Sequence, residues 1–123
     1  MEVQIKATGI TLTPATKDYV TKKAAAFEKY LEGNSPAAKH YVEVGKTTSH
    51  HKQGNLFRAE FNLSAPGRQF RSETEAADLY AAVDEAQEKM IAELRDTKDK
   101  ETTMFRRGAR RLKEYLRRRF YKS

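Results

Sequence analysis

Apolar and polar residues alternate at the start of the chain, where Val3, Ile5 and Ala7 are separated by polar side chains. Successive side chains of a β-strand point to opposite faces, so this alternation is typical of a strand with one buried face. We therefore predict a strand over residues 2–8.

A helix is predicted after this strand. Thr13 is a favourable N-cap residue, and Pro14 is well tolerated at the first helical position. Four apolar residues then recur at helical spacing: Val20, Ala24, Phe27 and Leu31. The helix should span residues 14–31 and end near Gly33 and Pro36, which disfavour its continuation.

Alternation with a period of two returns from His40 onward and predicts two further strands. Their apolar positions are Val42 and Val44 in one strand and Phe57, Ala59, Phe61 and Leu63 in the other. Residues 49–55 are the expected loop between them. Pro66 and Gly67 suit the central positions of a type II turn into a short fourth strand over residues 68–72. These three strands predict an antiparallel meander.

The second predicted helix has the clearest apolar stripe. Thr74 is its expected N-cap, and Glu75 in the first turn complements the helix dipole. The stripe consists of Leu79, Val83, Ala86, Met90 and Leu94. At roughly 100° per residue these residues fall within about 80° of arc. The polar segment 95–103 is the expected linker to the rest of the chain. The order strand, helix, three strands, helix indicates an α+β fold (β-α-β-β-β-α) with one four-stranded sheet.

Residues 103–120 carry another helical pattern. Its apolar residues are Phe105, Ala109, Leu112, Leu116 and Phe120, and most of the arginines lie opposite them. Gly108 weakens such a helix by about 1 kcal/mol relative to alanine, and short isolated helices are marginal in water. The sequence therefore leaves open whether this segment is ordered before it meets a partner.

Charge is unevenly distributed along the chain. Residues 103–123 contain nine basic residues and one acidic residue, a net charge of +8, whereas the whole chain has a net charge of +7. Residues 1–102 are therefore left with a net charge of −1. A segment this basic indicates a polyanionic partner, either a nucleic acid or an anionic membrane.

The composition narrows the class of protein. A chain of 123 residues fits one domain, and no apolar run approaches the roughly 20 residues that span a bilayer. The N-terminus carries no export signal, and the chain has no cysteine. We therefore expect a cytoplasmic protein without disulfides or thiolate metal sites.

Signatures of catalysis are nearly absent. The sequence has no phosphate-binding glycine loop, no G-x-S-x-G elbow and no cysteine nucleophile. His50 and His51 are neighbours in a predicted loop, which is a poor arrangement for a metal clamp. The acidic residues near the second helix are Glu73, Glu75, Asp78, Asp84, Glu85 and Glu88. They favour a solvated helix face over a general acid and base, so we expect no catalysis, metal or cofactor. The alternative is a nuclease that uses them.

Basic residues lie off the apolar stripes of both helices. They are Lys22, Lys23 and Lys29 in the first helix and Lys89, Arg95, Lys98 and Lys100 in or just after the second. Such side chains can reach the phosphates of a nucleic acid, although lysine-rich helix faces are also common without any partner. Tyr19 and Tyr30 beside them could stack on bases or shield the edge of the core.

Two segments carry a resemblance to a known family. "DLYAAVD" at residues 78–84 resembles the D-x-Y-x-A-I-D opening of the second helix in the short-type ribosome hibernation promoting factors, also called ribosome-associated inhibitors or subunit-interface proteins. "TPATKDYVTKKAAAFEKY" at residues 13–30 is similar to their first helix. The resemblance covers residues 1–100 and includes the order of the elements.

The resemblance implies a non-catalytic cytoplasmic protein that binds the small ribosomal subunit and its rRNA in the decoding channel. There it would block mRNA and tRNA and inhibit translation in stress or stationary phase. It implies two helices on one face of the sheet, similar to double-stranded-RNA-binding domains, and no small-molecule substrate or membrane. The basic positions that match the family are Lys17, Lys23, Lys29, Lys89, Lys98 and Lys100, with Arg95 a looser match.

Three positions depart from the family pattern. Ala26 stands where relatives often have lysine, and Ala92 and Glu93 stand where they often have arginine and glutamine. Part of the usual rRNA contact set is therefore missing. The chain is also too short to hold the separate dimerisation domain of long-type members, so we expect a monomer away from the ribosome.

The basic C-terminal segment differs from the short extensions of these relatives. We expect residues 1–102 to form the ribosome-binding domain and residues 103–123 to form a tail that supplies charge toward rRNA. The candidate rRNA-binding residues of the tail are Arg106, Arg107, Arg110, Arg111, Arg117 and Arg118. Two alternatives remain. One is a free-standing RNA-binding module that acts off the ribosome, and the other is a tail that lies on an anionic membrane surface.

Overall fold

The computed structural model of the protein describes residues 2–31, 35–48 and 55–120. Its strands are β1 (Glu2–Thr8), β2 (Lys39–Thr48), β3 (Asn55–Ala65) and β4 (Arg68–Ala76). Its α-helices are α1 (Pro14–Ala25) and α2 (Leu79–Phe120), and two short 3-10 helices, η1 (Glu28–Tyr30) and η2 (Ser35–Ala37), follow α1. This order confirms the predicted α+β fold. Residues 49–54 of the predicted loop, with His50 and His51, lie outside the described residues, as does Gly33, and Asn55 already belongs to β3.

The strands form one mixed sheet in the order β1-β2-β3-β4. β1 runs parallel to β2, with Ile5 beside Val42, and α1 lies in the connection between them. β2, β3 and β4 pair antiparallel, which confirms the predicted meander. Gly67 has a φ of 75° in the β3–β4 turn, as the third position of a type II turn requires.

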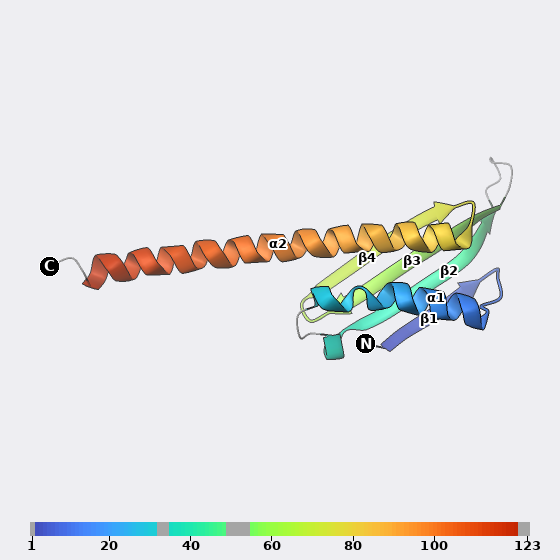
Figure 1. Ribbon diagram of the computed structural model, residues 1–123, viewed down its shortest axis with the longest axis horizontal. Helices are drawn as coiled ribbons and strands as arrows, with labels where there is room; N and C mark the ends of the chain where they lie inside the picture. Colours follow the sequence, from blue (N-terminus) through green and yellow to red (C-terminus); the bar gives the residue numbers. More distant parts are fainter. Residues whose placement is uncertain (1, 32–34, 49–54, 121–123) are drawn as a thin grey trace.

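Both helices cover the same face of the sheet, with α1 on the side of β1 and α2 over β3 and β4 (Figure 1). The largest fully buried side chains are Phe27, Phe61, Leu63, Met90, His40, Val20, Val44 and Val83. Phe27 and Phe61 meet edge to face, with ring centroids 5.3 Å apart. The predicted apolar stripes of both helices therefore form one core with the inner face of the sheet.

His40 is a polar residue inside this core. Its ring is 1% exposed and lies 5.3 Å from the ring of Phe27 and 5.5 Å from the ring of Phe61. Within the described part of the chain, neither ring nitrogen has a hydrogen-bond partner. Burial lowers the pKa of His40 to about 4, so the ring is neutral at pH 7.

The first helix is shorter than predicted. α1 begins at Pro14 with Thr13 as its N-cap, as expected, but it ends at Ala25 rather than at residue 31. The amide of Phe27 donates a hydrogen bond to the carbonyl of Ala24, three residues earlier, at 3.0 Å. The same three-residue spacing of donor and acceptor continues in η1. Such tightening satisfies carbonyls at a helix end, and it keeps Phe27 buried.

The prediction that Thr74 caps the second helix is wrong. β4 is longer than expected, and Thr74 pairs with Ala59 within the sheet. α2 begins at Leu79, where the carboxylate of Asp78 accepts a hydrogen bond from the amide of Ala81 at 3.2 Å. Threonine suits both N-caps and strands, and here strand pairing determines its place.

The predicted linker over residues 95–103 is also wrong, because α2 continues through it as one helix of 42 residues, about 63 Å long. The segment contains neither glycine nor proline, and Lys100 pairs with Asp96 one turn earlier at 3.1 Å. A domain boundary at residue 102 stays a prediction.

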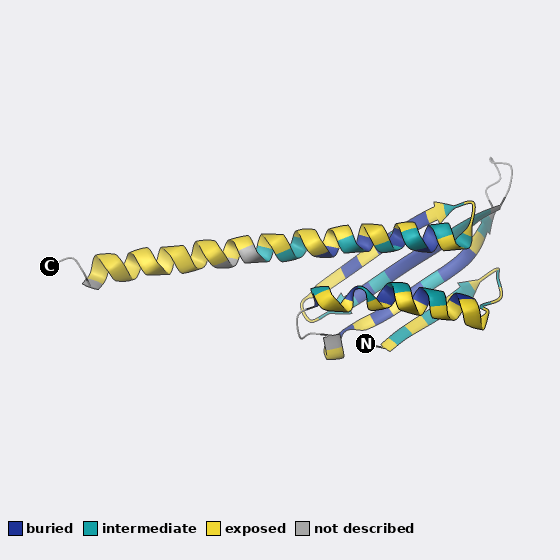
Figure 2. Ribbon diagram, in the orientation of Figure 1, coloured by how far each residue is buried: buried dark blue, intermediate teal, exposed yellow. Residues whose placement is uncertain are grey.

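We call residues 103–120 of α2 the extension. It runs on past the end of the sheet (Figure 1), and every described side chain in it is exposed (Figure 2). The side chains of Phe105 and Phe120 lie outside the described part. No helix among the described residues is long and apolar enough to cross a bilayer.

Candidate nucleic-acid interface

The "DLYAAVD" motif joins the start of α2 to α1. Tyr80 packs edge-on against Tyr19, with ring centroids 4.5 Å apart. Asp84 accepts a hydrogen bond from the Tyr19 hydroxyl and pairs with Lys23 at 3.1 Å. Asp78 caps α2. The three polar residues of the motif therefore build the helix start and the α1–α2 junction.

This junction holds Lys23 in place. The hydrogen bond from Tyr19, together with Lys23, lowers the pKa of Asp84. The same carboxylate raises the pKa of Lys23, whose Nζ lies 5.2 Å from the Tyr19 ring centroid. Lys23 is therefore charged but already paired, which makes it a weaker phosphate ligand than an unpaired lysine.

Lys17 and Lys22 are the accessible cations of α1. Both side chains are exposed, and neither has an ion-pair partner within the described residues. Lys22 lies in the last turn of the helix, where the helix dipole favours positive charge. Both lysines can therefore approach a polyanion without breaking an internal contact.

A second basic group surrounds Tyr30, and we call Lys29, Tyr30 and Arg95 the Tyr30 cluster. The Nζ of Lys29 lies 5.2 Å from the centroid of the Tyr30 ring. The Nη2 of Arg95 donates to the Tyr30 hydroxyl across 3.5 Å, and this bond lowers the pKa of Tyr30. An aromatic ring between two cations suits contact with a base and its neighbouring phosphates.

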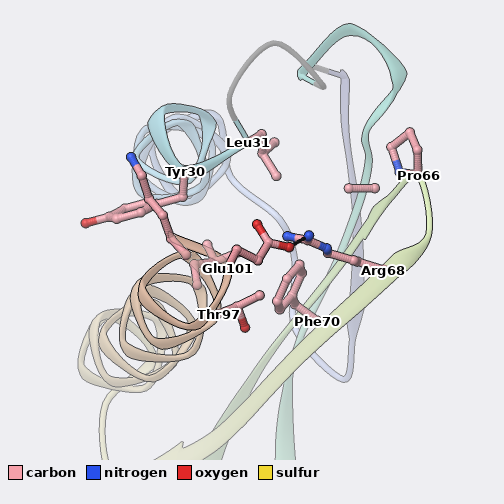
Figure 3. A pocket seen from close by; sticks show the side chains of 10 residues that line it. Tyr30, Leu31, Pro66, Arg68, Phe70, Thr97 and Glu101 are labelled. Atoms are coloured by element: carbon pink, nitrogen blue, oxygen red, sulfur yellow. Dashed lines mark ion pairs between the residues drawn. The ribbon is translucent and has the colours of Figure 1, made fainter. Parts of the chain in front are cut away.

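A pocket of about 140 Å³ lies beside this cluster, where α2 leaves the sheet (Figure 3). Its lining includes Lys98, Leu31 and Phe70. Arg68 of β4 and Glu101 of α2 form an ion pair in it. Sequence reasoning missed this pair, because the two residues are far apart in the chain and no periodic pattern links them.

Lys89 and Lys100 lie on another flank of α2. The Nζ of Lys89 is 3.5 Å from the backbone carbonyl oxygen of Glu73 on β4. At roughly 100° per residue, Lys100 lies about 20° around the helix from Lys89. Lys100 pairs with Asp96. Arg95 instead contacts Tyr30, on the side of α1. The structure therefore divides the predicted lysines and arginine of α2 between two flanks rather than gathering them in one patch.

The predicted arginines of the extension are exposed, and none has an ion-pair partner within the described residues. At roughly 100° per residue they fall on two adjoining sides of the helix. Those on the side away from the sheet are Arg106, Arg110 and Arg117. Those on the flank of Lys89 are Arg107, Arg111 and Arg118. The extension thus presents a continuous basic surface.

The face of the sheet opposite the helices carries a network of paired charges. Glu60 accepts hydrogen bonds from Arg71 at 2.8 Å and from Asn62 at 3.0 Å, and it also pairs with Arg58. Glu73 pairs with the same two arginines at 2.5 and 2.6 Å. Arg71 lowers the pKa of Glu60, and Arg58 lowers the pKa of Glu73. Glu73 is therefore held in two ion pairs, which is not the arrangement of a general acid.

Metal-binding groups are not gathered in the described ranges. No three or more histidine, aspartate or glutamate side chains lie close enough there to hold a metal ion.

Comparison with known proteins identifies relatives of the whole fold. Residues 3–102 match the family model for the sigma 54 modulation protein / S30EA ribosomal protein. The ribosome hibernation promoting factor of Klebsiella oxytoca is 28% identical over 102 residues, covering 81% of this chain and 96% of that protein. The factor of the same name from Pseudomonas putida is 26% identical, covering 90% and 100%. The ribosome hibernation promotion factor of Bacillus subtilis is 29% identical, and the match covers 86% of this chain but only 53% of that protein.

Solved structures show the same fold. The crystal structure of the Thermus thermophilus Protein Y N-terminal domain has a TM-score of 0.58 at 28% identity, covering 77% of this chain and 94% of that chain. A ribosomal subunit interface protein from Coxiella burnetii has a TM-score of 0.60 at 18% identity, covering 80% and 99%, and shows the shared fold alone. These findings confirm the resemblance seen in the sequence. Because the family model spans residues 3–102, the chain belongs to the sigma 54 modulation protein / S30EA ribosomal protein family.

Proposed function

We propose that this protein is a cytoplasmic ribosome hibernation factor without catalytic activity. It binds the small ribosomal subunit at the decoding channel and keeps mRNA and tRNA from binding, which inhibits translation in stress or stationary phase. The observation that carries this proposal is the segregation of charge in a fold of this family. Among the described residues, the extension presents a continuous surface of arginines without ion-pair partners and α1 adds Lys17 and Lys22. On the outer face of the sheet, by contrast, the arginines of β3 and β4 are held in ion pairs.

The names of the relatives support the ribosomal part of the proposal. Three matched proteins are named as ribosome hibernation promoting or promotion factors. The charge of the extension supports an rRNA partner, because binding to a polyanion releases counterions and favours surfaces rich in unpaired arginine and lysine.

The proposed rRNA contacts are Lys17, Lys22, Lys23, Lys29, Lys89, Arg95, Lys98, Lys100, Arg106, Arg107, Arg110, Arg111, Arg117 and Arg118. Within the sheet-packed part of the fold, Lys17 and Lys22 should contribute most per residue, since no described acidic side chain competes for them. Lys23 and Lys100 should contribute less, because Asp84 and Asp96 already pair with them.

Co-sedimentation with separated small subunits at several salt concentrations tests the proposal. The double variant Lys17→Gln/Lys22→Gln should bind more weakly. The slope of log affinity against log salt should become less steep by about 0.7–0.9 for each phosphate that the variant no longer neutralises. The matched control is Lys6→Gln/Lys39→Gln, which removes two exposed lysines from the outer face of the sheet. It should leave affinity and slope unchanged.

Competition decides where on the subunit the protein lies. Bound protein should be displaced by mRNA and tRNA together. Binding that survives an excess of both would place the site outside the decoding channel. Binding to RNA duplexes or single strands, without binding to subunits, would instead favour a free-standing RNA-binding module.

A further inference from the structure

The extension has an uncovered apolar stripe in addition to its basic surface. Met104, Leu112, Tyr115 and Leu116 are 71%, 59%, 57% and 43% exposed. At roughly 100° per residue these four side chains fall within about 120° of arc, and most of the arginines lie outside it. We call these four residues the apolar stripe. A helix of a globular protein normally buries a stripe of this width.

The apolar stripe points to the same side of α2 as the core does. At roughly 100° per residue, 18 residues make five full turns, so Ala86 and Met104 share one direction, as do Leu94 and Leu112. Ala86 and Leu94 are 0% and 3% exposed, because they pack on the sheet. Met104 and Leu112 belong to the extension, which runs on past the end of the sheet (Figure 1), and no described residue covers them.

The ion pair between Arg68 and Glu101 marks a contact of α2 with the sheet just before the uncovered extension begins. It joins β4 to α2 at the last turn before the extension. The pocket beside it is lined by Leu31 and Phe70, so apolar surface lies next to the root of the extension as well (Figure 3). Whatever covers the apolar stripe must therefore approach from the side of the sheet and lie close to the end of the domain.

A flat membrane fits this arrangement poorly. An interfacial helix sinks its apolar face about 5–10 Å into the boundary between headgroups and acyl chains. The sheet lies along one side of α2 (Figure 1), and by helix geometry the apolar stripe points to that same side. The domain would therefore meet the membrane surface before the apolar stripe could enter it.

A second copy of the chain is disfavoured by charge. At roughly 100° per residue, Arg111 and Lys113 border the apolar stripe on its two sides, and Arg119 falls within it. Two extensions that paired through their stripes would bring these cations together, with Glu114 as the only acidic residue of either extension. Like charges at such an interface are destabilising.

We propose that the apolar stripe docks on an acidic protein segment of the small ribosomal subunit. This segment presents apolar side chains to Leu112 and Leu116 and aspartate or glutamate side chains to the bordering cations. The inference rests on the proposed function, and it makes the extension a connector with two different partners. The arginines on its other sides contact rRNA, and the apolar stripe contacts protein.

Photo-crosslinking on intact small subunits separates the two sides of the extension. A benzophenone amino acid in place of Leu112 should crosslink to a ribosomal protein, and one in place of Arg110, on the opposite side, should crosslink to rRNA. Crosslinks from position 112 to rRNA alone, or to a second copy of the chain, would overturn the inference.

Affinity measurements provide a second test. The double variant Leu112→Gln/Leu116→Gln keeps good helix formers in place, which circular dichroism can verify. It should bind intact small subunits about tenfold more weakly and bind protein-free rRNA of the same subunit as the unaltered protein does. The matched control is Tyr41→Gln, which removes an apolar side chain, 46% exposed, from the outer face of the sheet and should change neither affinity.

The outcomes distinguish this inference from the function on which it rests. Two results would overturn the docking of the apolar stripe on a protein segment. One is an unchanged affinity of Leu112→Gln/Leu116→Gln for intact subunits, and the other is an equal loss of affinity for protein-free rRNA. Neither result would contradict ribosome binding itself. A stripe-dependent association with anionic vesicles at the same protein concentration would also overturn the docking. If the unaltered protein bound no subunits at all, the proposed function would fall, and this inference with it.

Discussion

The two halves of α2 share one helical geometry and differ in what surrounds them. Residues 79–101 pack on the sheet, and the extension projects beyond it. Leu94 and Leu112 point in one direction, yet they are 3% and 59% exposed. Burial stabilises the first half, whereas within the described chain the second is stabilised by local interactions along the helix, chiefly backbone hydrogen bonds and helix propensity. Apolar periodicity therefore predicts which side of a helix is apolar, but not whether that side is covered.

The largest effect on stability should come from truncating a leucine in the first half of α2, and the same truncation in the second half is its comparison. Leu94→Ala should lower the free energy of unfolding by about 2–5 kcal/mol, because it leaves a cavity between α2 and the sheet. Leu112→Ala should change it by less than about 0.5 kcal/mol, because its side chain already faces solvent. Urea denaturation followed by circular dichroism measures both. Equal losses would show that the extension is covered in the free protein.

A smaller effect should come from protonation in the core. The pKa of His40 is about 4 in the folded protein, below the ordinary histidine value of 6.5, so the unfolded chain binds a proton that the folded protein does not. The stability should therefore fall as the pH drops from 6.5 toward 4, by roughly 3 kcal/mol in total. Urea titrations between pH 7 and 5 detect the upper part of this loss, before the carboxylates of Glu60 and Glu73 protonate.

The variant His40→Phe isolates this effect. It places an apolar ring of similar shape beside Phe27 and Phe61, and it should remove most of the dependence of stability on pH in that window. A slope that persists in the variant would assign the titration to another group. Leu112→Ala should keep the slope of the unaltered protein, because the extension takes no part in the core.

The smallest effect should come from Gly108→Ala. In the described part of the chain, the Cβ that this change would add meets no atom within 4 Å other than its chain neighbours and the adjoining helix backbone. The gain should therefore be the intrinsic preference of about 1 kcal/mol for alanine in a helix. Slower hydrogen exchange of amides in the extension, at an unchanged urea midpoint, is the expected result. Gly45→Ala is the contrast, because its Cβ would lie 2.6 Å from the carbonyl oxygen of Thr8, and it should lower the midpoint.

The sequence predicted the sheet better than the helix boundaries. Val3, Ile5 and Ala7 alternate with polar residues, and a strand explains this pattern with no competitor, so β1 has the predicted bounds. Thr74 suits both a strand and an N-cap, and only its pairing with Ala59 decides between them. Segment 95–103 is polar because solvent surrounds most of the helix there, and polarity alone does not distinguish an exposed helix from a linker.

The candidate site was predictable in composition but not in arrangement. The charge of the extension can be counted from the sequence, and the "DLYAAVD" motif identified the family. The pairing of Lys23 with Asp84 and the Tyr30 cluster depend on contacts between residues more than 60 positions apart. Local patterns do not encode such contacts, so the sequence could not separate paired cations from accessible ones.

The continuity of α2 removes the nucleation step from the extension. An isolated helix of this length must fix its first turn before it gains its hydrogen bonds, and that step is unfavourable by a factor of about 1,000. Here the first turns are already formed on the sheet, so each residue after Glu101 only elongates an existing helix. The extension should therefore fray from its free end, where Arg117, Arg118 and Arg119 interact favourably with the helix dipole. Its binding surface is ordered in advance, and little conformational entropy is lost when a partner arrives.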